Sequence, residues 1–225
     1  MSTMMTMNGP VFQVSRGMAA RPVVFVVDDD VSVRESLASL IRAAGWQPDT
    51  FASAREFLAR PRTSVPSCLI LDADLPDFNG LELQKRLAVE RPHTPIVFVT
   101  AYADVPVSVQ AMKAGAVEFL MKPLGADVVL DAIEQALERS RRALERDAKL
   151  KALRESYRSL TPREREVMVL VVSGRLNKQV GGELGISEIT VKAHRGQVMR
   201  KMKADSLPAL VHIVSSLGLS TPLNA

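Results

Sequence analysis

Residues 23–30 read VVFVVDDD, in which five apolar residues are followed directly by three aspartates. A short run without polar positions is typical of a strand that is buried on both faces of a sheet. Comparable runs occur at residues 68–71, 96–99 and 119–121, with a weaker one at residues 47–51. Each run therefore predicts one strand of a common, buried sheet.

Amphipathic segments separate these runs. Val33, Leu37 and Ile41 recur four residues apart, and Gly45 follows them as a residue type that commonly ends a helix. Strands that alternate with helices favour a parallel sheet with helices on both faces. The sequence therefore predicts an α/β fold over residues 21–138, with a doubly wound, five-stranded parallel sheet.

The second half of the chain carries helical signals. Residues 127–157 contain no glycine or proline, so the last helix of the sheet domain is expected to continue as a helical linker at residues 139–158. Residues 159–225 are expected to form an all-α domain of four helices that includes a helix-turn-helix.

Local signals place the helix starts in this second domain. Thr161 and Glu164 are expected to form a capping box at the start of its first helix. Asn177 and Ser187 are expected to cap the second and third helices. An apolar stripe predicts the fourth helix at residues 207–217.

The composition bounds the setting in which the protein works. Hydrophobic residues make up 47% of the 225 residues, which suits packed domains. Cys68 is the one cysteine, so no disulfide can form within the chain, and this favours a reducing compartment. Apolar runs are too short to span a bilayer, and residues 1–20 lack the pattern of a signal peptide and are expected to be a disordered tail. We therefore expect a cytoplasmic protein with no membrane partner.

Charge is distributed unevenly along the chain. Residues 21–137 contain 11 Lys and Arg against 16 Asp and Glu, whereas residues 138–225 contain 17 against 9. An acidic half joined to a basic half indicates two domains with different partners, and the basic half suits a polyanion. A helix with solvated basic residues would give the same composition.

Five polar residues come directly after the predicted strands: Asp28, Asp29, Asp72, Thr100 and Lys122. The carboxyl ends of parallel strands lie at one edge of a sheet, so these side chains are expected to converge. Clustered carboxylates suit Mg²⁺, which takes oxygen ligands. An ionised aspartate beside such a cation can attack a phosphoryl group, while a lysine and a hydroxyl contact the phosphoryl oxygens. Each residue alone would suit a turn or a cap, and only the ordered set indicates phosphoryl transfer.

Four segments resemble the signature segments of response-regulator receiver domains: VVFVVDDD (23–30), LILDADLPDFNG (69–80), IVFVTAYADVP (96–106) and AVEFLMKPL (116–124). The resemblance covers residues 22–138 and implies a flavodoxin-like fold. It implies that Asp28, Asp29 and Asp72 hold Mg²⁺ and that Asp72 accepts a phosphoryl group from a histidine kinase. It also implies that Thr100 and Lys122 contact the phosphoryl oxygens and that Phe119 moves with Thr100 on activation.

Positions next to these residues bear on the lifetime of the phosphoryl group. Asp74 lies two residues after Asp72, and with Tyr102 it is expected to tune that lifetime. The sequence departs from the family pattern at Leu124, where phenylalanine is usual, and at Tyr102, where the nearest relatives often carry histidine. Both departures leave the dephosphorylation rate open.

A basic helix is expected near the C-terminus. Its predicted buried stripe consists of Val191, Val198 and Met202. The opposite face carries basic and small residues, which are Lys192, Ala193, Gly196 and Arg200. Such a face can enter the major groove of double-stranded DNA, where Lys and Arg reach guanine edges or phosphates. A solvated helix in a small bundle has a similar pattern.

Residues 160–202 resemble the LuxR-type helix-turn-helix domain, over a region that extends to residues 158–220. Its order after a receiver is similar to that of the FixJ/NarL subfamily, in particular its FixJ-like and StyR-like members. The resemblance implies that Lys192, Ala193 and Gly196 face bases. The residues expected at phosphates are Asn177, Lys178, Thr190 and Arg195. Residues 207–217 are expected to help two such domains pair.

One departure concerns the second helix of this domain. Gly181 and Gly182 stand where helix formers are common, and each helix-interior glycine costs about 1 kcal/mol relative to alanine. The stability of that helix is therefore open, although its position is not.

The combined expectation is a transcriptional response regulator. A histidine kinase is expected to phosphorylate Asp72, and phosphorylation is expected to produce a homodimer that binds promoter DNA, with RNA polymerase as a further partner. The chain is expected to assist its own phosphorylation and dephosphorylation without being a turnover enzyme.

Two alternatives remain. The DAD motif at residues 72–74 also resembles the nucleophile loop of haloacid-dehalogenase-type phosphatases, although in that family the extra acids follow the lysine, whereas here an acid pair comes first. The other alternative is a DNA-binding regulator whose receiver-like half acts by partner contact without phosphorylation.

Overall fold

The computed structural model describes residues 21–76, 78–101 and 105–219. The chain divides into an N-terminal unit, Met1–Arg141, and a C-terminal unit, Arg142–Ala225. The tail expected at residues 1–20 and the residue Tyr102 lie outside the described residues.

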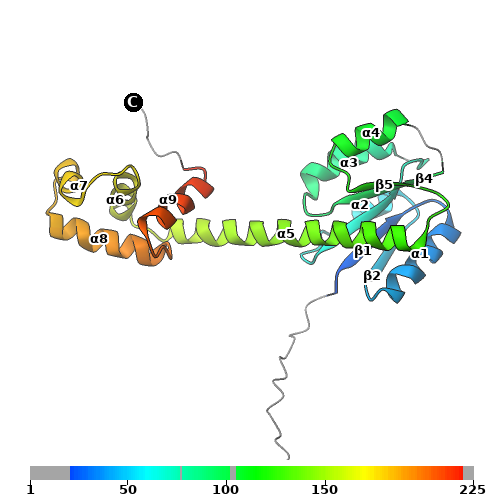
Figure 1. The fold of residues 1–225 in the computed structure, drawn as a ribbon, viewed down its shortest axis with the longest axis horizontal. Coiled ribbons are helices and arrows are strands. Elements are labelled where there is room, and N and C mark those ends of the chain that lie inside the picture. Colours follow the sequence, from blue (N-terminus) through cyan, green and yellow to red (C-terminus); the bar gives the residue numbers. More distant parts are fainter. Residues whose placement is uncertain (1–20, 77, 102–104, 220–225) are drawn as a thin grey trace, which may run out of the picture. The chain divides into compact units, whose positions relative to one another are not determined.

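The N-terminal unit is built on a parallel sheet with the strand order β2-β1-β3-β4-β5 (Figure 1). Its strands among the described residues are β1 (Val23–Val27), β2 (Gln47–Phe51), β3 (Ser67–Asp72), β4 (Ile96–Thr100) and β5 (Glu118–Met121). All neighbouring pairs in this order are parallel. Strands β3 and β4 are buried at every position, which explains why their sequences are apolar almost throughout. The doubly wound five-stranded sheet expected from the sequence is confirmed.

Helices cover both faces of this sheet (Figure 1). One face packs against α1 (Val31–Ala43) and the first half of α5 (Ala126–Arg158). The other face packs against α2 (Ala54–Ala59), α3 (Gly80–Glu90) and α4 (Val105–Lys113). The short helix α2 was not predicted, because six residues are too few to show a helical period.

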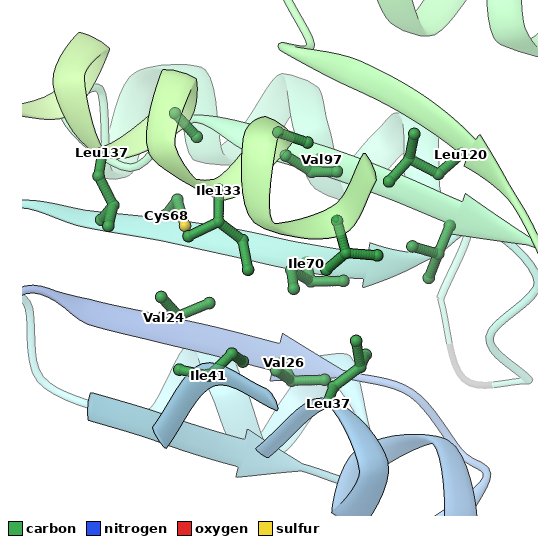
Figure 2. Close-up of a cluster of buried hydrophobic side chains, with 14 residues drawn as sticks. Val24, Val26, Leu37, Ile41, Cys68, Ile70, Val97, Leu120, Ile133 and Leu137 are labelled. Atoms are coloured by element: carbon green, nitrogen blue, oxygen red, sulfur yellow. The ribbon is translucent and has the colours of Figure 1, made fainter. Parts of the chain in front are cut away.

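The core under α1 and α5 consists of aliphatic side chains from both helices and from the strands between them (Figure 2). Ile133 of α5 and Ile41 of α1 are fully buried, as is Cys68 of β3. Burial raises the pKa of the Cys68 thiol far above its usual range. The thiol therefore stays protonated and packs as a small apolar group.

Ser140 ties α5 to the edge of the sheet where β3 begins. The backbone N–H of Ser67, the first residue of β3, donates to Ser140 Oγ at 3.0 Å, and the Ser140 hydroxyl donates to the His93 carbonyl. Helix α5 begins shortly after β5 ends, so it crosses from the carboxyl edge of the sheet to the amino edge. The division between the two units falls one residue later, at Arg141.

The described part of the C-terminal unit contains, after the end of α5, the helices α6 (Pro162–Val172), α7 (Asn177–Leu184), α8 (Glu188–Lys201) and α9 (Leu207–Ser216). The expected set of four helices is therefore confirmed. The apolar sides of α6, α8 and α9 meet in one core, where Met168, Met202 and Leu210 are fully buried.

Two of the three predicted caps are confirmed. The Thr161 backbone N–H donates to Glu164 Oε2 at 2.7 Å, and the Glu164 N–H donates to Thr161 Oγ1 at 3.2 Å, which completes the capping box of α6. Ser187 Oγ accepts from the Thr190 N–H at 3.1 Å at the start of α8. The prediction for Asn177 is wrong, because α7 begins at Asn177 itself and Leu176 holds the cap position.

The paired glycines of α7 occupy different environments. A Cβ at Gly181 would lie 2.7 Å from the Ile186 carbonyl oxygen, closer than such atoms pack. A Cβ at Gly182 would have no neighbour within 4 Å in the described part of the chain. Gly181 therefore lets the turn after α7 fold tightly against the helix, and Gly185 ends the helix at φ +65°, in the left-handed region.

Candidate functional site

The acidic residues meet where the winding of the sheet reverses direction. Strands β1 and β3 are parallel neighbours, and Val27 of β1 pairs with Leu71 of β3. Asp28 and Asp72 are the next residues of each strand, so they lie side by side at the carboxyl edge. In doubly wound sheets this point of the edge opens a crevice that serves as a ligand site.

Three carboxylates lie within reach of one cation. One oxygen from each of Asp28, Asp29 and Asp72 lies within 4.8 Å of the other two. Asp28 and Asp72 are buried, whereas Asp29 is exposed. An oxygen-only site that is open on one side suits Mg²⁺, because this ion binds a small number of carboxylates and keeps several waters. The convergence predicted from the sequence is therefore present.

Lys122 lies opposite the two buried carboxylates. It follows β5 directly, and its Nζ donates to Asp28 Oδ2 at 2.8 Å and to Asp72 Oδ2 at 2.7 Å. The same ammonium group therefore partly neutralises both acids. A lysine in this place can equally contact the oxygens of a phosphoryl group on Asp72.

Burial and hydrogen bonds act in opposite directions on the pKa values of Asp28 and Lys122. Burial, aided by the charge of Asp72, raises the pKa of Asp28 above its ordinary value of 3.8, although hydrogen bonds from Lys122 and the Asp30 N–H oppose the shift. Burial alone would lower the pKa of Lys122, but its hydrogen bonds to both carboxylates outweigh burial and raise it. Lys122 therefore stays charged, while Asp28 is an acid that gains from a further cation.

Asp72 is held in a defined orientation. Its Oδ1 accepts from the Asp74 N–H at 2.9 Å, and its Oδ2 accepts from Lys122. Asp30, by contrast, caps α1 by accepting from the Ser32 N–H at 2.8 Å.

Thr100 lies at the same edge but binds a different acid. It is the buried last residue of β4, and its Oγ1 donates to Asp74 Oδ2 at 2.7 Å. On the neighbouring strand, Phe119 is partly buried and lies 5.9 Å from Phe98 between ring centroids. The sequence placed Thr100 and Asp74 near Asp72 but did not predict the bond between them.

The C-terminal unit presents the basic helix face expected from the sequence. Val191, Val198 and Met202 are buried. The predicted opposite face is exposed along its length, at Lys192, Ala193, Gly196 and Arg200. Lys192 Nζ lies 3.0 Å from Glu188 Oε1, one helical turn earlier on α8. Glu188 was not among the residues predicted from the sequence.

The residues expected at phosphates flank this face. Lys178 is exposed, and Arg195 Nη1 donates to Asn177 Oδ1 at 3.2 Å, which joins α8 to the start of α7. Thr190 is half-buried, and its hydroxyl lies 2.8 Å from Ser187 Oγ. Polar side chains from both helices of the helix-turn-helix therefore border the exposed face of α8.

Comparisons with known proteins agree with both halves of this geometry. Residues 24–134 match the response regulator receiver domain, and residues 158–214 match the bacterial regulatory proteins of the luxR family. Nodulation protein W of Bradyrhizobium diazoefficiens is 46% identical over 202 residues, which cover 90% of this chain and 89% of that protein. The chain belongs to the response-regulator family.

Two further proteins are similar to this chain over most of its length. The transcriptional regulatory protein FixJ of Bradyrhizobium diazoefficiens is 37% identical over 203 residues, which cover 90% of this chain and 98% of that protein. The solved structure of the response regulator StyR is 47% identical, with a TM-score of 0.78, and the match covers 87% of this chain and 99% of that one. The FixJ-like and StyR-like resemblance stated from the sequence is confirmed.

No helix in the described ranges of this response regulator is both long and apolar enough to cross a membrane. Leu124, one of the departures from the family pattern, packs against the core under α1 and α5. The other departure, Tyr102, lies outside the described residues.

Proposed function

We propose that this chain is a DNA-binding transcriptional regulator that is switched by phosphorylation of Asp72. The observation that carries the proposal is the meeting of Asp28, Asp29 and Asp72 within 4.8 Å of one another, with Lys122 bound to two of them. These are the groups that phosphoryl transfer to an aspartate requires.

The phosphoryl donor is a phosphohistidine of a histidine kinase. A carboxylate oxygen of Asp72 forms a new O–P bond, while the N–P bond of the donor breaks and its imidazole nitrogen leaves with the electron pair. Mg²⁺ held by Asp28 and Asp29, together with Asp72, would supply charge compensation for the phosphoryl oxygens. Lys122 supplies a second positive charge from the opposite side.

The chain also assists removal of the phosphoryl group by hydrolysis, without being a turnover enzyme. Water attacks the phosphorus of the acyl phosphate, which regenerates the Asp72 carboxylate and releases inorganic phosphate. The exposed Asp74 carboxylate lies next to this position. We therefore assign to Asp74 an influence on the lifetime of the phosphoryl group.

Thr100 is the residue that senses the phosphoryl group. Its hydroxyl donates to Asp74 in the unphosphorylated chain, and it must leave that partner to donate to a phosphoryl oxygen on Asp72. Phe119, on the strand next to Thr100, then repacks. A ligand shifts a two-state protein only if it binds the two states differently, and this exchange of partners provides such a difference.

Phosphorylation acts by pairing two copies of the chain. Four large apolar side chains are exposed on α4 and on the strand β5 that it contacts, namely Val105, Val109, Met112 and Met121. Val105, Val109 and Met112 lie at i, i+4 and i+7 and therefore share one face of α4, and an exposed apolar face indicates a partner surface. A pair of chains places two α8 helices on half-sites about one DNA turn apart, and RNA polymerase is the further partner of the bound dimer.

Three parts of the chain carry out phosphorylation, connection and DNA binding. Residues 21–138 form the receiver domain, residues 139–158 form the helical linker, and residues 159–225 form the DNA-binding domain. Within the last domain, α8 enters the major groove, where Lys192, Ala193, Gly196 and Arg200 face bases and phosphates. Asn177, Lys178, Thr190 and Arg195 hold the flanking phosphates. The cytoplasm is the compartment in which a kinase and DNA are both available.

The test is acyl-phosphate labelling of the full chain by radiolabelled acetyl phosphate, followed by sizing and DNA-binding measurements. We expect Mg²⁺-dependent labelling, a shift to a dimer and tighter DNA binding, all lost in Asp72→Asn. The matched control is Asp131→Asn, which removes an exposed carboxylate of α5 and leaves labelling unchanged. Labelling of Asp72→Asn, or dimer formation and DNA binding in that variant in response to the donor, would overturn the proposal.

A further inference from the structure

Helix α8 exposes an apolar side chain that the DNA contacts described above leave unused. Ile189 is 79% exposed in the first turn of the helix, which begins at Glu188. A single exposed apolar residue needs no explanation by its exposure alone. Its position relative to the basic face is what makes it informative.

Ile189 lies in the middle of the exposed face of α8. At about 100° per residue, the directions of Lys192, Ala193, Gly196 and Arg200 all fall within about 60° of its own. All four of these residues are exposed, whereas Val191 and Val198 are buried on the other side of the helix. Ile189 therefore points the same way as the face assigned to DNA.

Ile189 projects from this face as a branched apolar side chain, and its neighbours on the face are either small or charged. Ala193 follows it one turn later and carries a single methyl group, and Gly196 has no side chain; a Cβ added there would meet nothing within 4 Å among the described residues. The remaining side chains of the face, Lys192 and Arg200, are long and charged. Close approach to a groove would thus bring one branched apolar group against the base edges.

We propose that Ile189 is a specificity-determining residue that recognises the C5-methyl group of thymine in the major groove. The inference rests on the DNA-binding function proposed above. The thymine methyl is the apolar group that base pairs present in the major groove, and the first residues of a recognition helix are those that reach base edges. Ile189 and Lys192 are separated by about 4.5 Å along the helix axis, so this thymine lies within about two base pairs of the base that Lys192 contacts.

The experiment uses the full chain activated with beryllofluoride and Mg²⁺. Preferred double-stranded sites are first selected from a random library at fixed salt, and each thymine of a half-site is then replaced in turn by uracil, which lacks only the methyl group. We expect one position per half-site at which uracil weakens binding by about fourfold, the size of one buried methyl group. At that position Ile189→Ala should bind thymine and uracil equally.

A matched control separates this contact from a general loss of apolar surface. Val169→Ala shortens a side chain on α6 that is 38% exposed, and it should keep the full difference between thymine and uracil. At the same position, cytosine that carries a C5-methyl group should bind wild type better than plain cytosine and should give Ile189→Ala no advantage.

The outcomes distinguish this inference from the function on which it rests. If the activated chain selects and binds a site but no uracil substitution weakens it, the role of Ile189 is refuted and the DNA-binding function stands. The same holds if Ile189→Ala keeps the full uracil effect. If the activated chain binds no DNA, the proposed function fails and the inference fails with it.

Discussion

The hydroxyl of Thr100 donates a hydrogen bond to Asp74 Oδ2 at 2.7 Å, and Asp74 in turn donates its backbone N–H to Asp72. Thr100, the residue assigned to sense the phosphoryl group, is therefore held by a carboxylate two residues from Asp72, the position proposed to be phosphorylated. In the unphosphorylated chain this bond opposes the movement of Thr100 toward Asp72.

Asp74→Ala should make the chain easier to activate. A partly exposed hydrogen bond to a charged group contributes about 1 kcal/mol, so its loss should raise the activated fraction of the unphosphorylated chain about fivefold. The measurement is DNA affinity without a phosphodonor, compared with that of the beryllofluoride-activated wild type. Asp74→Asn is the matched control, because its amide oxygen still accepts from Thr100 and should give a smaller gain. Equal affinities for wild type and Asp74→Ala would contradict this role.

Asp28→Asn should stabilise the N-terminal unit in the absence of divalent cations. Burial raises the pKa of Asp28, so the stability that this shift contributes is present below pH 3.8 and is lost as the pH rises through the raised pKa. At neutral pH the ionised carboxylate therefore costs stability. The asparagine avoids that cost, and its single oxygen still accepts from one of the two donors, the Asp30 N–H or Lys122. We expect a gain of about 1 kcal/mol, or about 4 °C in melting temperature.

Trp46 makes this prediction measurable in one unit alone, because it is the single tryptophan of the chain and lies in the N-terminal unit. Its fluorescence should follow the melting of that unit with EDTA and with Mg²⁺. Wild type should gain stability from Mg²⁺ through preferential binding to the folded state, whereas Asp28→Asn should gain much less. A variant that melts below wild type in EDTA would rule out the destabilising role of the ionised Asp28.

Glu164→Gln should destabilise the C-terminal unit in a pH-dependent way. The hydrogen bond from Lys201, at 2.7 Å, and the N–H of Thr161 lower the pKa of Glu164. The stability that this shift contributes is present above the ordinary pKa of 4.5 and is lost as the pH falls through the lowered value. We expect a loss of about 1 kcal/mol at neutral pH that shrinks steadily below pH 4.5.

Urea unfolding followed by far-ultraviolet circular dichroism, with the Trp46 transition as the reference for the other unit, gives this difference at each pH. Lys201→Ala supplies the partner for a double-mutant cycle, in which Glu164→Gln should cost less once the lysine is removed. A difference that stays constant from neutral to acid pH would show that the charge on Glu164 is not its cause.

The two glycines of α7 should respond to alanine in opposite directions. Gly182→Ala places a methyl group in open space and should stabilise the C-terminal unit by about 1 kcal/mol. Gly181→Ala places one 2.7 Å from the Ile186 carbonyl oxygen, and it should destabilise the unit by about 1 to 3 kcal/mol, as overpacking does. The urea unfolding described above measures the free energy of unfolding of both variants. If the two substitutions change it in the same direction, the tight turn after α7 is refuted.

The sequence was sufficient to predict the sheet and the meeting of the carboxylates because both follow from short-range signals. An apolar run that ends in Asp28 or Asp72 predicts a buried strand and places the acid at the carboxyl edge of the sheet. This signal is contained within a few residues. The capping box of Thr161 and Glu164 is likewise complete within four residues.

Features set by packing between distant segments could not be predicted in the same way. The partner of Thr100 depends on which side chains its rotamer meets across the sheet edge, and a contact over 26 residues leaves no periodic trace. Leu176 holds the cap position of α7, and the side chain of Asn177 accepts from Arg195 on α8. The exposure of Ile189, by contrast, could have been predicted from its helical spacing to Lys192 and Ala193.

The hydrogen bonds of Ser140 limit how a change at Asp72 can reach the linker part of α5. About 14 helical residues separate the start of α5 from Ser140, a span of about 21 Å, so the chain departs from the rim of the sheet farthest from Asp72. The hydrogen bonds of Ser140 to Ser67 and His93 clamp the helix at that rim. Because these bonds hold α5 at the rim opposite Asp72, the proposed switch is expected to act through the pairing of two receivers rather than through a movement of this segment.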